Sequence, residues 1–161
     1  MTDSGNAIIS ECGQYRYWLE RGEPNAPYVA WVLANPSTAD AELDDPTVRK
    51  ARGFTERWGY KRFVFVNLFA GRSTDPRGLL KMDDPIGPEN GTHIARALAG
   101  ADKIVFAWGN AIAKPLRDRA RVSATFLREL KPGMCLGYTK DRQPRHPLML
   151  AYSTPLEIYR P

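Results

Sequence analysis

Cysteine and long apolar runs are both scarce in this sequence. The two cysteines, Cys12 and Cys135, lie far apart, and neither has a second cysteine or histidine at metal-ligand spacing. The sequence therefore predicts neither a disulfide scaffold nor a zinc site. No stretch approaches the roughly 18 to 20 apolar residues of a membrane span, and residues 1–6 lack the pattern of a secretion signal. We therefore expect a cytoplasmic protein without a membrane partner.

The chain does have enough apolar sequence for one core. A length of 161 residues and a hydrophobic content of 43% suit a single α/β domain over residues 1–161. The net charge is +5, and positive charge is concentrated between residues 114 and 145. The basic residues of this stretch are Lys114, Arg117, Arg119, Arg121, Arg128, Lys131, Lys140, Arg142 and Arg145. Such charge favours a nucleic acid or nucleotide partner, and a solvated helix face is the alternative.

Continuous apolar runs predict a buried parallel sheet. Three such runs cover residues 28–34, 63–68 and 104–108, and a weaker one covers residues 134–138. Runs of this kind are typical of central strands that helices cover on both faces. Residues 15–21 alternate in polarity and are rich in aromatics, which predicts a half-exposed antiparallel edge strand at the N-terminal side.

Helical patterns separate these strands. Asp45 is expected to cap a helix that begins at Pro46 and ends near Gly59. A shorter helix is predicted from about residue 92 to 99, and a third, with a basic outer face, over residues 115–131. The alternation predicts an α/β three-layer sandwich, with a mainly parallel central sheet of about four strands plus the edge strand.

Polar loops follow the expected strands at the edge where open α/β sheets hold ligands. The candidate site residues in these four loops are Asn35, Ser37, Thr38, Asp40, Asn67, Arg72, Trp108, Gly109, Asn110, Lys140, Arg145 and His146. Amides, hydroxyls, arginines and a histidine are expected to meet there. The pattern predicts a pocket for a small polar ligand or a nucleobase.

The amides and the histidines differ in what their surroundings suggest. Asn67, at a strand end, offers a donor and an acceptor that suit the edge of a base. The alternative is that Asn35 and Asn67 cap turns or helices. His146 lies in a loop between two prolines, which favours a role in proton transfer or oxyanion stabilisation. His93 falls within the shorter helix and is interpreted as structural or exposed.

Carboxylates gather just before the first helix. The cluster contains Asp40, Glu42, Asp44 and Asp45, and hard oxygen ligands of this kind suit magnesium. However, Asp45 is accounted for as a helix cap, and the spacing matches no metal-binding loop. We therefore interpret these residues as loop acids and expect neither a metal nor a cofactor.

Short motifs resemble those of the uracil-DNA glycosylase superfamily. Residues 33–37 resemble its Gly-x-Asn-Pro-Gly type motif, and residues 66–68 resemble the strand end whose Asn reads the base. Residues 106–111 resemble its apolar strand ending in Trp-Gly, and residues 145–148 its His-Pro-Ser motif. More closely, the strings NPSTAD at residues 35–40 and TKDxxPRHPL at residues 139–148 resemble an uncharacterised bacterial and phage family of unknown function, over nearly the whole chain.

The superfamily resemblance implies a parallel four-stranded sheet between helices and hydrolysis of an N-glycosidic bond. It implies that Asn35 positions the attacking water, that Asn67 reads the base and that His146 donates to the departing base. The base would be flipped out of a duplex, or presented in a single strand or a free nucleotide. Ser37 and Leu148 depart from the superfamily pattern, because they replace a glycine and a phosphate-binding serine.

Two apolar residues, Leu148 and Met149, follow the last motif. We interpret them as core residues, and the alternative is an apolar wedge that enters a base stack. Taken together, the sequence predicts a glycosylase-like protein that acts on a base in nucleic acid or a nucleotide. A non-catalytic nucleic-acid or nucleotide binding module and an enzyme of small-nucleotide metabolism are the alternatives.

Overall fold

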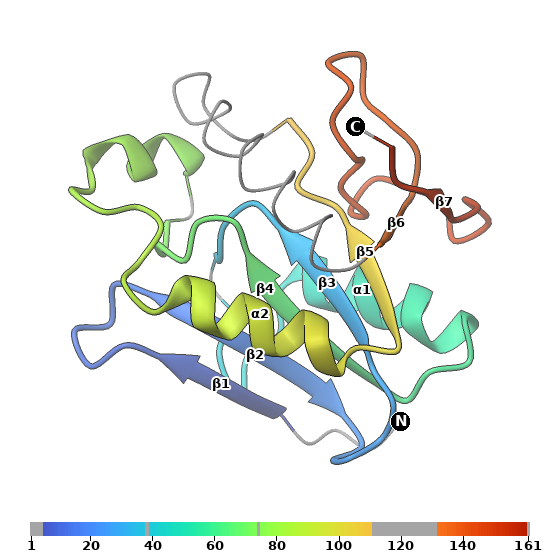
Figure 1. Cartoon of the computed structure of the whole chain (residues 1–161), viewed down its shortest axis with the longest axis horizontal. Coiled ribbons are helices and arrows are strands. Elements are labelled where there is room, and N and C mark those ends of the chain that lie inside the picture. The colour runs from blue at the N-terminus through green and yellow to red at the C-terminus, as the bar shows by residue number, and fades with distance from the viewer. Residues whose placement is uncertain (1–4, 38, 74, 111–131, 161) are drawn as a thin grey trace.

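The fold consists of a mixed β-sheet with helices packed against it, in a computed structural model that describes residues 5–37, 39–73, 75–110 and 132–160 (Figure 1). Within these ranges the sheet has seven strands in the order β1-β2-β4-β3-β5-β6-β7. The strands are β1 (Gly5–Ile9), β2 (Arg16–Gly22), β3 (Val29–Leu33), β4 (Arg62–Asn67), β5 (Lys103–Phe106), β6 (Met134–Cys135) and β7 (Glu157–Ile158). The helices are α1 (Pro46–Arg57), α2 (Asn90–Gly100) and the 3₁₀ helix η1 (Pro76–Lys81).

The centre of the sheet is parallel. Strands β4, β3, β5 and β6 run in one direction, which confirms the predicted α/β class and the parallel pairing of these strands. The chain passes from β3 to β4 on one side and later to β5 on the other side of β3. The strand order therefore reverses at β3, and the carboxyl ends of β3 and β5 flank a topological switch point.

The edges of the sheet differ from the prediction. The expected edge strand, β2, is largely buried because β1 pairs with it on one side and β4 on the other, both antiparallel. Strand β1 has only a three-residue apolar run, Ala7 to Ile9, and its residues are exposed or half-buried. The strand expected over residues 134–138 is only the two-residue β6, which pairs with β5 and with the short β7.

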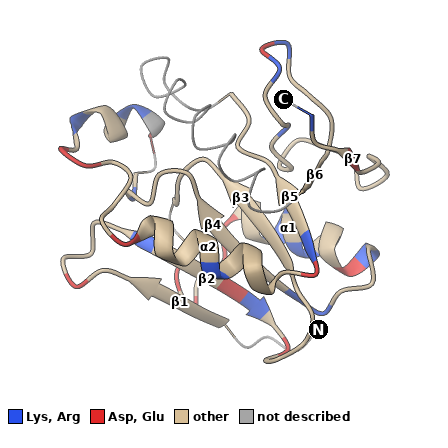
Figure 2. Ribbon diagram, in the orientation of Figure 1, with Lys and Arg blue, Asp and Glu red and all other residues tan. Residues whose placement is uncertain are grey.

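Two helices cover opposite faces of the sheet, with α2 in front of it and α1 behind it in Figure 1. The predicted cap is confirmed, because the Asp45 carboxylate accepts the Val48 N–H at 2.9 Å and α1 begins at Pro46. Helix α2 contains the predicted segment 92–99, whereas the third predicted helix lies outside the described residues. Figure 2 shows charges of both signs on β2 and none on β3. No helix of the described part has the length and apolarity to cross a membrane.

A bulge in β2 determines where Arg16 points. The pairing with β1 skips Tyr17, so that Tyr17 and Trp18 both face α2 although they are adjacent. Tyr17 stacks on His93 with ring centroids 5.1 Å apart, and Trp18 lies under the guanidinium of Arg96. Neighbouring side chains of a regular strand point to opposite faces, and a bulge breaks this alternation. Arg16 is therefore directed toward the α1 side of the sheet.

Candidate functional site

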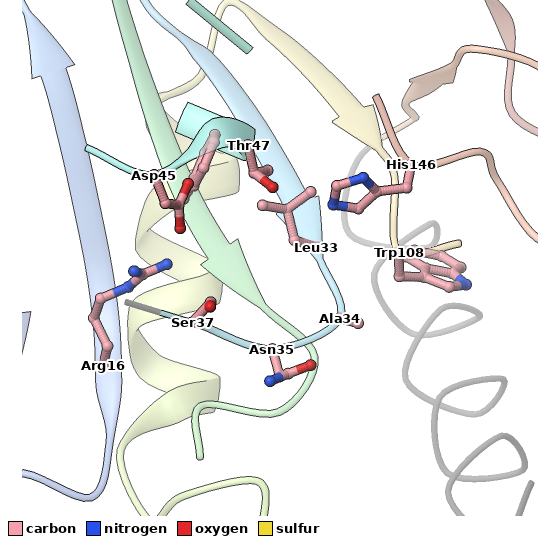
Figure 3. Close-up of a pocket in the computed structure, with 10 residues that line it drawn as sticks. Arg16, Leu33, Ala34, Asn35, Ser37, Asp45, Thr47, Trp108 and His146 are labelled. Atoms are coloured by element: carbon pink, nitrogen blue, oxygen red, sulfur yellow. The ribbon is translucent and has the colours of Figure 1, made fainter. Parts of the chain in front are cut away.

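A cavity of about 80 Å³ lies at the carboxyl ends of β3 and β5, beside the N-terminus of α1 (Figure 3). Its lining residues are Arg16, Leu33, Ala34, Asn35, Ser37, Asp45, Thr47, Phe65, Trp108 and His146. They come from β2, β3, the loop after β3, β4, the N-terminus of α1 with its cap, the loop after β5 and the loop between β6 and β7. The cavity is thus located at the switch point of the sheet, where open α/β folds hold their ligands.

The loop that carries His146 is docked onto the end of β5. The Gly109 N–H donates to the carbonyl of Pro144 at 2.8 Å, and the Trp108 indole N–H donates to Gln143 Oε1 at 2.8 Å. Gly109 has a φ of +62°, and a Cβ there would lie 3.1 Å from the Cβ of His146. Glycine is required at this turn because both the backbone conformation and the close approach disfavour a side chain.

The hydrogen bonds of His146 fix which ring nitrogen carries the proton. The Leu148 N–H donates to Nδ1 at 3.2 Å, so Nδ1 must be unprotonated. Burial lowers the pKa of His146, and the negative charge of Asp45 opposes this only in part. The ring is therefore neutral near pH 7, with its proton on Nε2. Figure 3 shows the ring turned toward Leu33, so the cavity contains a neutral N–H donor.

The amide of Asn35 is held in one orientation. Its Nδ2 donates to the carbonyl oxygens of Pro36 and Ser73, each at 3.0 Å. Because both partners are acceptors, the nitrogen and the oxygen of this amide are assigned without ambiguity. Asn35 lines the cavity, and this assignment makes Oδ1 the acceptor atom of its amide.

Asn67 is buried beside the cavity. It is 1% exposed, and neither atom of its side-chain amide has a hydrogen-bond partner among the described residues. It pairs with Leu33 across β3 and β4, and it lies two residues after Phe65 on β4. Asn67 is therefore on the same face of the sheet as these two lining residues, although it does not line the cavity itself. An unpaired buried polar group costs about 1–3 kcal/mol, so such a group calls for an explanation.

Arg16 was not predicted from the sequence, yet it lines the cavity and is only 2% exposed. Its Nη1 donates to the Ala39 carbonyl at 2.7 Å, while its Nε is buried without a partner in the described part of the chain. Burial lowers the pKa of Arg16 to about 10, and Asp45 opposes this effect. The guanidinium is still charged near pH 7. The sequence signal for this role was an arginine within an aromatic strand. In a strand whose side chains alternate regularly, however, Arg16 would be expected on the surface.

The acidic residues before α1 have protein partners. Asp45 caps α1, and Asp44 binds Arg21 at 2.7 Å and Arg52 at 2.8 Å. Asp40 accepts two backbone N–H groups of its own turn, at 2.7 and 2.9 Å. Within the described ranges, no three His, Cys, Asp or Glu side chains are grouped so that they could hold a metal ion. Of these acids, Asp45 alone lines the cavity.

The comparison with models of known protein families assigns the chain to one family. A family model described as a protein of unknown function, DUF1643, matches residues 16–148. The chain belongs to the DUF1643 family. The match spans the chain from Arg16 to beyond His146, and so contains every residue that lines the cavity of this DUF1643 protein. Neither the comparison with curated proteins nor that with solved structures found a significant match.

The structure brings together only some of the predicted site residues of this DUF1643 protein. Asn35, Ser37, Trp108 and His146 line one cavity and Asn67 lies next to it, whereas Thr38 lies outside the described residues. Six predicted residues do not line the cavity: Asp40, Arg72, Gly109, Asn110, Lys140 and Arg145. They follow strands, as expected, and most of them share a loop with a lining residue but occupy another position in it. Lys140 is exposed, for example, and Asn110 Oδ1 is 2.8 Å from the Thr139 hydroxyl.

The interpretation of Leu148 and Met149 as core residues was wrong. Leu148 is 39% exposed and Met149 is 90% exposed. The Leu150 N–H donates to the Pro147 carbonyl at 3.1 Å, which closes a turn. Leu150 takes the buried position, so the two residues before it project outward next to His146. Most of the basic stretch, residues 111–131, lies outside the described residues.

Proposed function

We propose that this DUF1643 protein recognises a nucleobase and hydrolyses its N-glycosidic bond. The observation that carries the proposal is the position of two groups of fixed orientation at one cavity: the Nε2–H of His146 and the Oδ1 of Asn35. The parallel order of β4, β3, β5 and β6, with helices on both faces, supports the three-layer fold that the resemblance to uracil-DNA glycosylases implies.

His146 supplies the group that the departing base needs. When the bond between C1′ and the base nitrogen breaks, its electron pair stays on the base, which becomes anionic. A neutral Nε2–H donor stabilises this anion, and it does so most strongly when the charge has developed. The lowered pKa of His146 keeps the donor neutral without a change of protonation during the reaction.

Asn35 is suited to the other half of the reaction. Its Oδ1 accepts a hydrogen bond from a water molecule and so orients the water oxygen toward C1′. The oxygen forms the new bond to the sugar, and the proton that the water loses passes to the base through solvent. Asn35 needs no charge for this task, because the oxocarbenium-like sugar is a strong electrophile.

Asn67 and the apolar walls account for recognition of the base. The unpaired amide of Asn67 offers a donor and an acceptor, the combination that reads a base edge. Phe65 and Trp108 contribute apolar surface, since the indole N–H of Trp108 is already bound to Gln143. A base that pairs with Asn67 would offset the cost of burying this amide.

The exposed pair Leu148 and Met149 favours a base within a nucleic-acid strand. Apolar side chains that project beside a base pocket can enter a base stack and hold the base out of it. The net charge of +5 agrees with a polyanionic partner.

The test is to incubate the full chain with single- and double-stranded oligonucleotides that contain uracil, hypoxanthine or a phage-type modified base, and to measure abasic sites by alkaline strand cleavage. We expect abasic sites from one of these bases and their loss in His146→Ala. Base-selective binding without abasic sites would indicate a non-catalytic module. Turnover of free nucleotides alone would indicate an enzyme of nucleotide metabolism. The absence of both binding and turnover would contradict the proposal.

A further inference from the structure

One end of the cavity has no role in the reaction proposed above. Arg16, Ser37 and Thr47 line the cavity, and Figure 3 shows Arg16 reaching in from β2 on the side away from His146. A guanidinium and two hydroxyls are hydrogen-bond donors, and together they suit an anionic group. This end therefore has a different chemistry from the end formed by Trp108 and His146.

The guanidinium of Arg16 forms no ion pair with the described residues. In the described part of the chain, no carboxylate oxygen lies within 4.0 Å of it, although it is 2% exposed. Its Nη1 is used by the Ala39 carbonyl, whereas Nε has no partner there. The edge formed by Nε and Nη2 is the one that binds a phosphate or carboxylate through two parallel hydrogen bonds. A buried cation without a partner is costly, and an anionic ligand would offset that cost.

Nearby charges of both signs act on this end of the cavity. Asp45 faces Arg16, but one of its oxygens accepts the Val48 N–H, and it sits at the positive end of the α1 dipole. Asp40, a weaker influence on Arg16, binds the backbone of its own turn. Arg72 contributes a second positive charge close enough to act on Arg16.

We propose that Arg16, with Ser37 and Thr47, forms a phosphate subsite, so that the ligand of the cavity is a nucleobase with its phosphate rather than a free base or a nucleoside. The proposal rests on the proposed function and specifies its substrate class. A free nucleotide and a nucleotide within a strand share this chemistry. Arginine suits the role because its planar fork matches phosphate oxygens, which a lysine cannot reproduce.

The test compares deoxyuridine, deoxyuridine 5′-monophosphate, inorganic phosphate and a uracil-containing single strand as ligands of the full chain, by isothermal titration calorimetry. We expect the monophosphate to bind about tenfold or more tightly than the nucleoside, which corresponds to one good charge-assisted contact. Inorganic phosphate should compete with it. Arg16→Met should remove this advantage and leave nucleoside affinity within a few fold, and Arg16→Lys should retain part of it.

Arg77→Gln is the matched control, because the Arg77 side chain is 83% exposed and, among the described residues, is paired with Asp75. It should leave all affinities unchanged. If Arg16→Met fails to fold, as judged by circular dichroism, the subsite is still tested by the wild-type affinities for deoxyuridine and its monophosphate and by Arg16→Lys. A loss restricted to the monophosphate assigns the subsite to free nucleotides, and a loss restricted to the strand assigns it to nucleic acid.

The subsite and the proposed function can fail separately. Equal affinity of wild type for deoxyuridine and its monophosphate, or an unchanged phosphate advantage in Arg16→Met, would overturn the subsite and leave base recognition intact. Binding of inorganic phosphate that depends on Arg16, without binding of any base, would support the subsite and count against the proposed function.

Discussion

Arg16 and Arg21 lie on the same strand and are almost equally buried, at 2% and 3% exposure. Arg21 binds Asp44 at 2.7 Å and backbone carbonyls around it, so the fold uses its hydrogen-bonding groups. Arg16 has one carbonyl partner and a buried Nε without any in the described part. The same residue type therefore stabilises the fold at one end of β2 and remains open to a ligand at the other.

Two further pairs also consist of one residue near the cavity and one away from it, although Asn90 Oδ1 and His93 Nδ1 are themselves buried without a partner among the described residues. Asn90 donates from its Nδ2 to the carbonyls of Asn67 and Leu68, at 2.9 and 3.3 Å, and so fixes the end of β4. Asn67 makes no such contact through its own side chain within the described ranges. His93, on α2, stacks on Tyr17 and has a buried Nδ1 without a partner in the described part, whereas His146 lines the cavity and accepts the Leu148 N–H at its Nδ1. Arg16, Asn67 and His146 all lie at the carboxyl ends of the parallel strands or beside them, which is where we propose that the ligand binds.

The largest effect is expected for the histidine pair. His146→Ala should lower the rate of base release by about 10²- to 10³-fold, the usual result of removing one preorganised donor, with affinity within a few fold. His93→Ala should leave the rate nearly unchanged, since His93 contributes to packing. Single-turnover kinetics and equilibrium binding on the same substrate separate the two. Equal losses of rate and affinity in His146→Ala would show that His146 only binds.

The arginine pair should differ in stability. Arg21→Met should lower the free energy of unfolding by about 3 kcal/mol, because it leaves Asp44 and buried carbonyls without their partner. Arg16→Met should change it by no more than about 1 kcal/mol, since loss of the Ala39 hydrogen bond is balanced by removal of an unpaired buried charge. Urea unfolding measures both values. A larger loss in Arg16→Met than in Arg21→Met would mean that Arg16 is structural.

The two substitutions of the asparagine pair should have smaller effects on stability, and these effects should be of opposite sign. Asn67→Leu should leave the free energy of unfolding unchanged or raise it by up to about 1 kcal/mol, because it removes an unpaired buried amide at similar volume. Asn90→Leu should lower it by about 1–2 kcal/mol, because two carbonyls lose their donor. The same unfolding experiment applies. Strong destabilisation by Asn67→Leu would show that the amide has a structural partner.

The smallest effect concerns pH. Burial lowers the pKa of both His146 and His93 below the ordinary value of 6.5, so the unfolded chain binds protons more readily than the folded one. The contribution of these neutral histidines to the free energy of unfolding should therefore be fully present above about pH 6.5. It should be lost as the pH decreases toward the folded pKa values. His146→Gln and His93→Gln should each reduce this dependence, measured by urea unfolding across pH. A slope unchanged in both variants would contradict the assigned protonation states.

The sequence predicted the centre of the fold better than its edges. Uninterrupted apolar runs identified β3, β4 and β5, and the Asp45 cap identified the start of α1, because both signals are local. The loops after β3 and β5 and the His146 loop were expected to meet, and four of their predicted residues do line one cavity. Strand β1 was missed because its apolar run is only three residues long, and its pairing depends on β2 rather than on its own pattern.

The missed half of the candidate site depends on contacts between distant segments. Arg16 enters the cavity only because a bulge at Tyr17 reverses the alternation of β2, which the sequence alone does not show. Asp45 was understood as a cap but not as a wall of the cavity. Conversely, Arg72 and Lys140 follow strands as site residues should, yet neither of them lines the cavity.

The central claim is that the polar groups left open at the carboxyl ends of the parallel strands form the ligand site. The most direct test is to follow the side-chain Nε–H of Arg16 and the Nδ2–H₂ of Asn67 by ¹⁵N NMR while deoxyuridine 5′-monophosphate is added. We predict that both signals shift with one common Kd, while the Nε–H of Arg21 stays in place. Saturable binding that moves other signals and leaves Arg16 and Asn67 unchanged would contradict the claim.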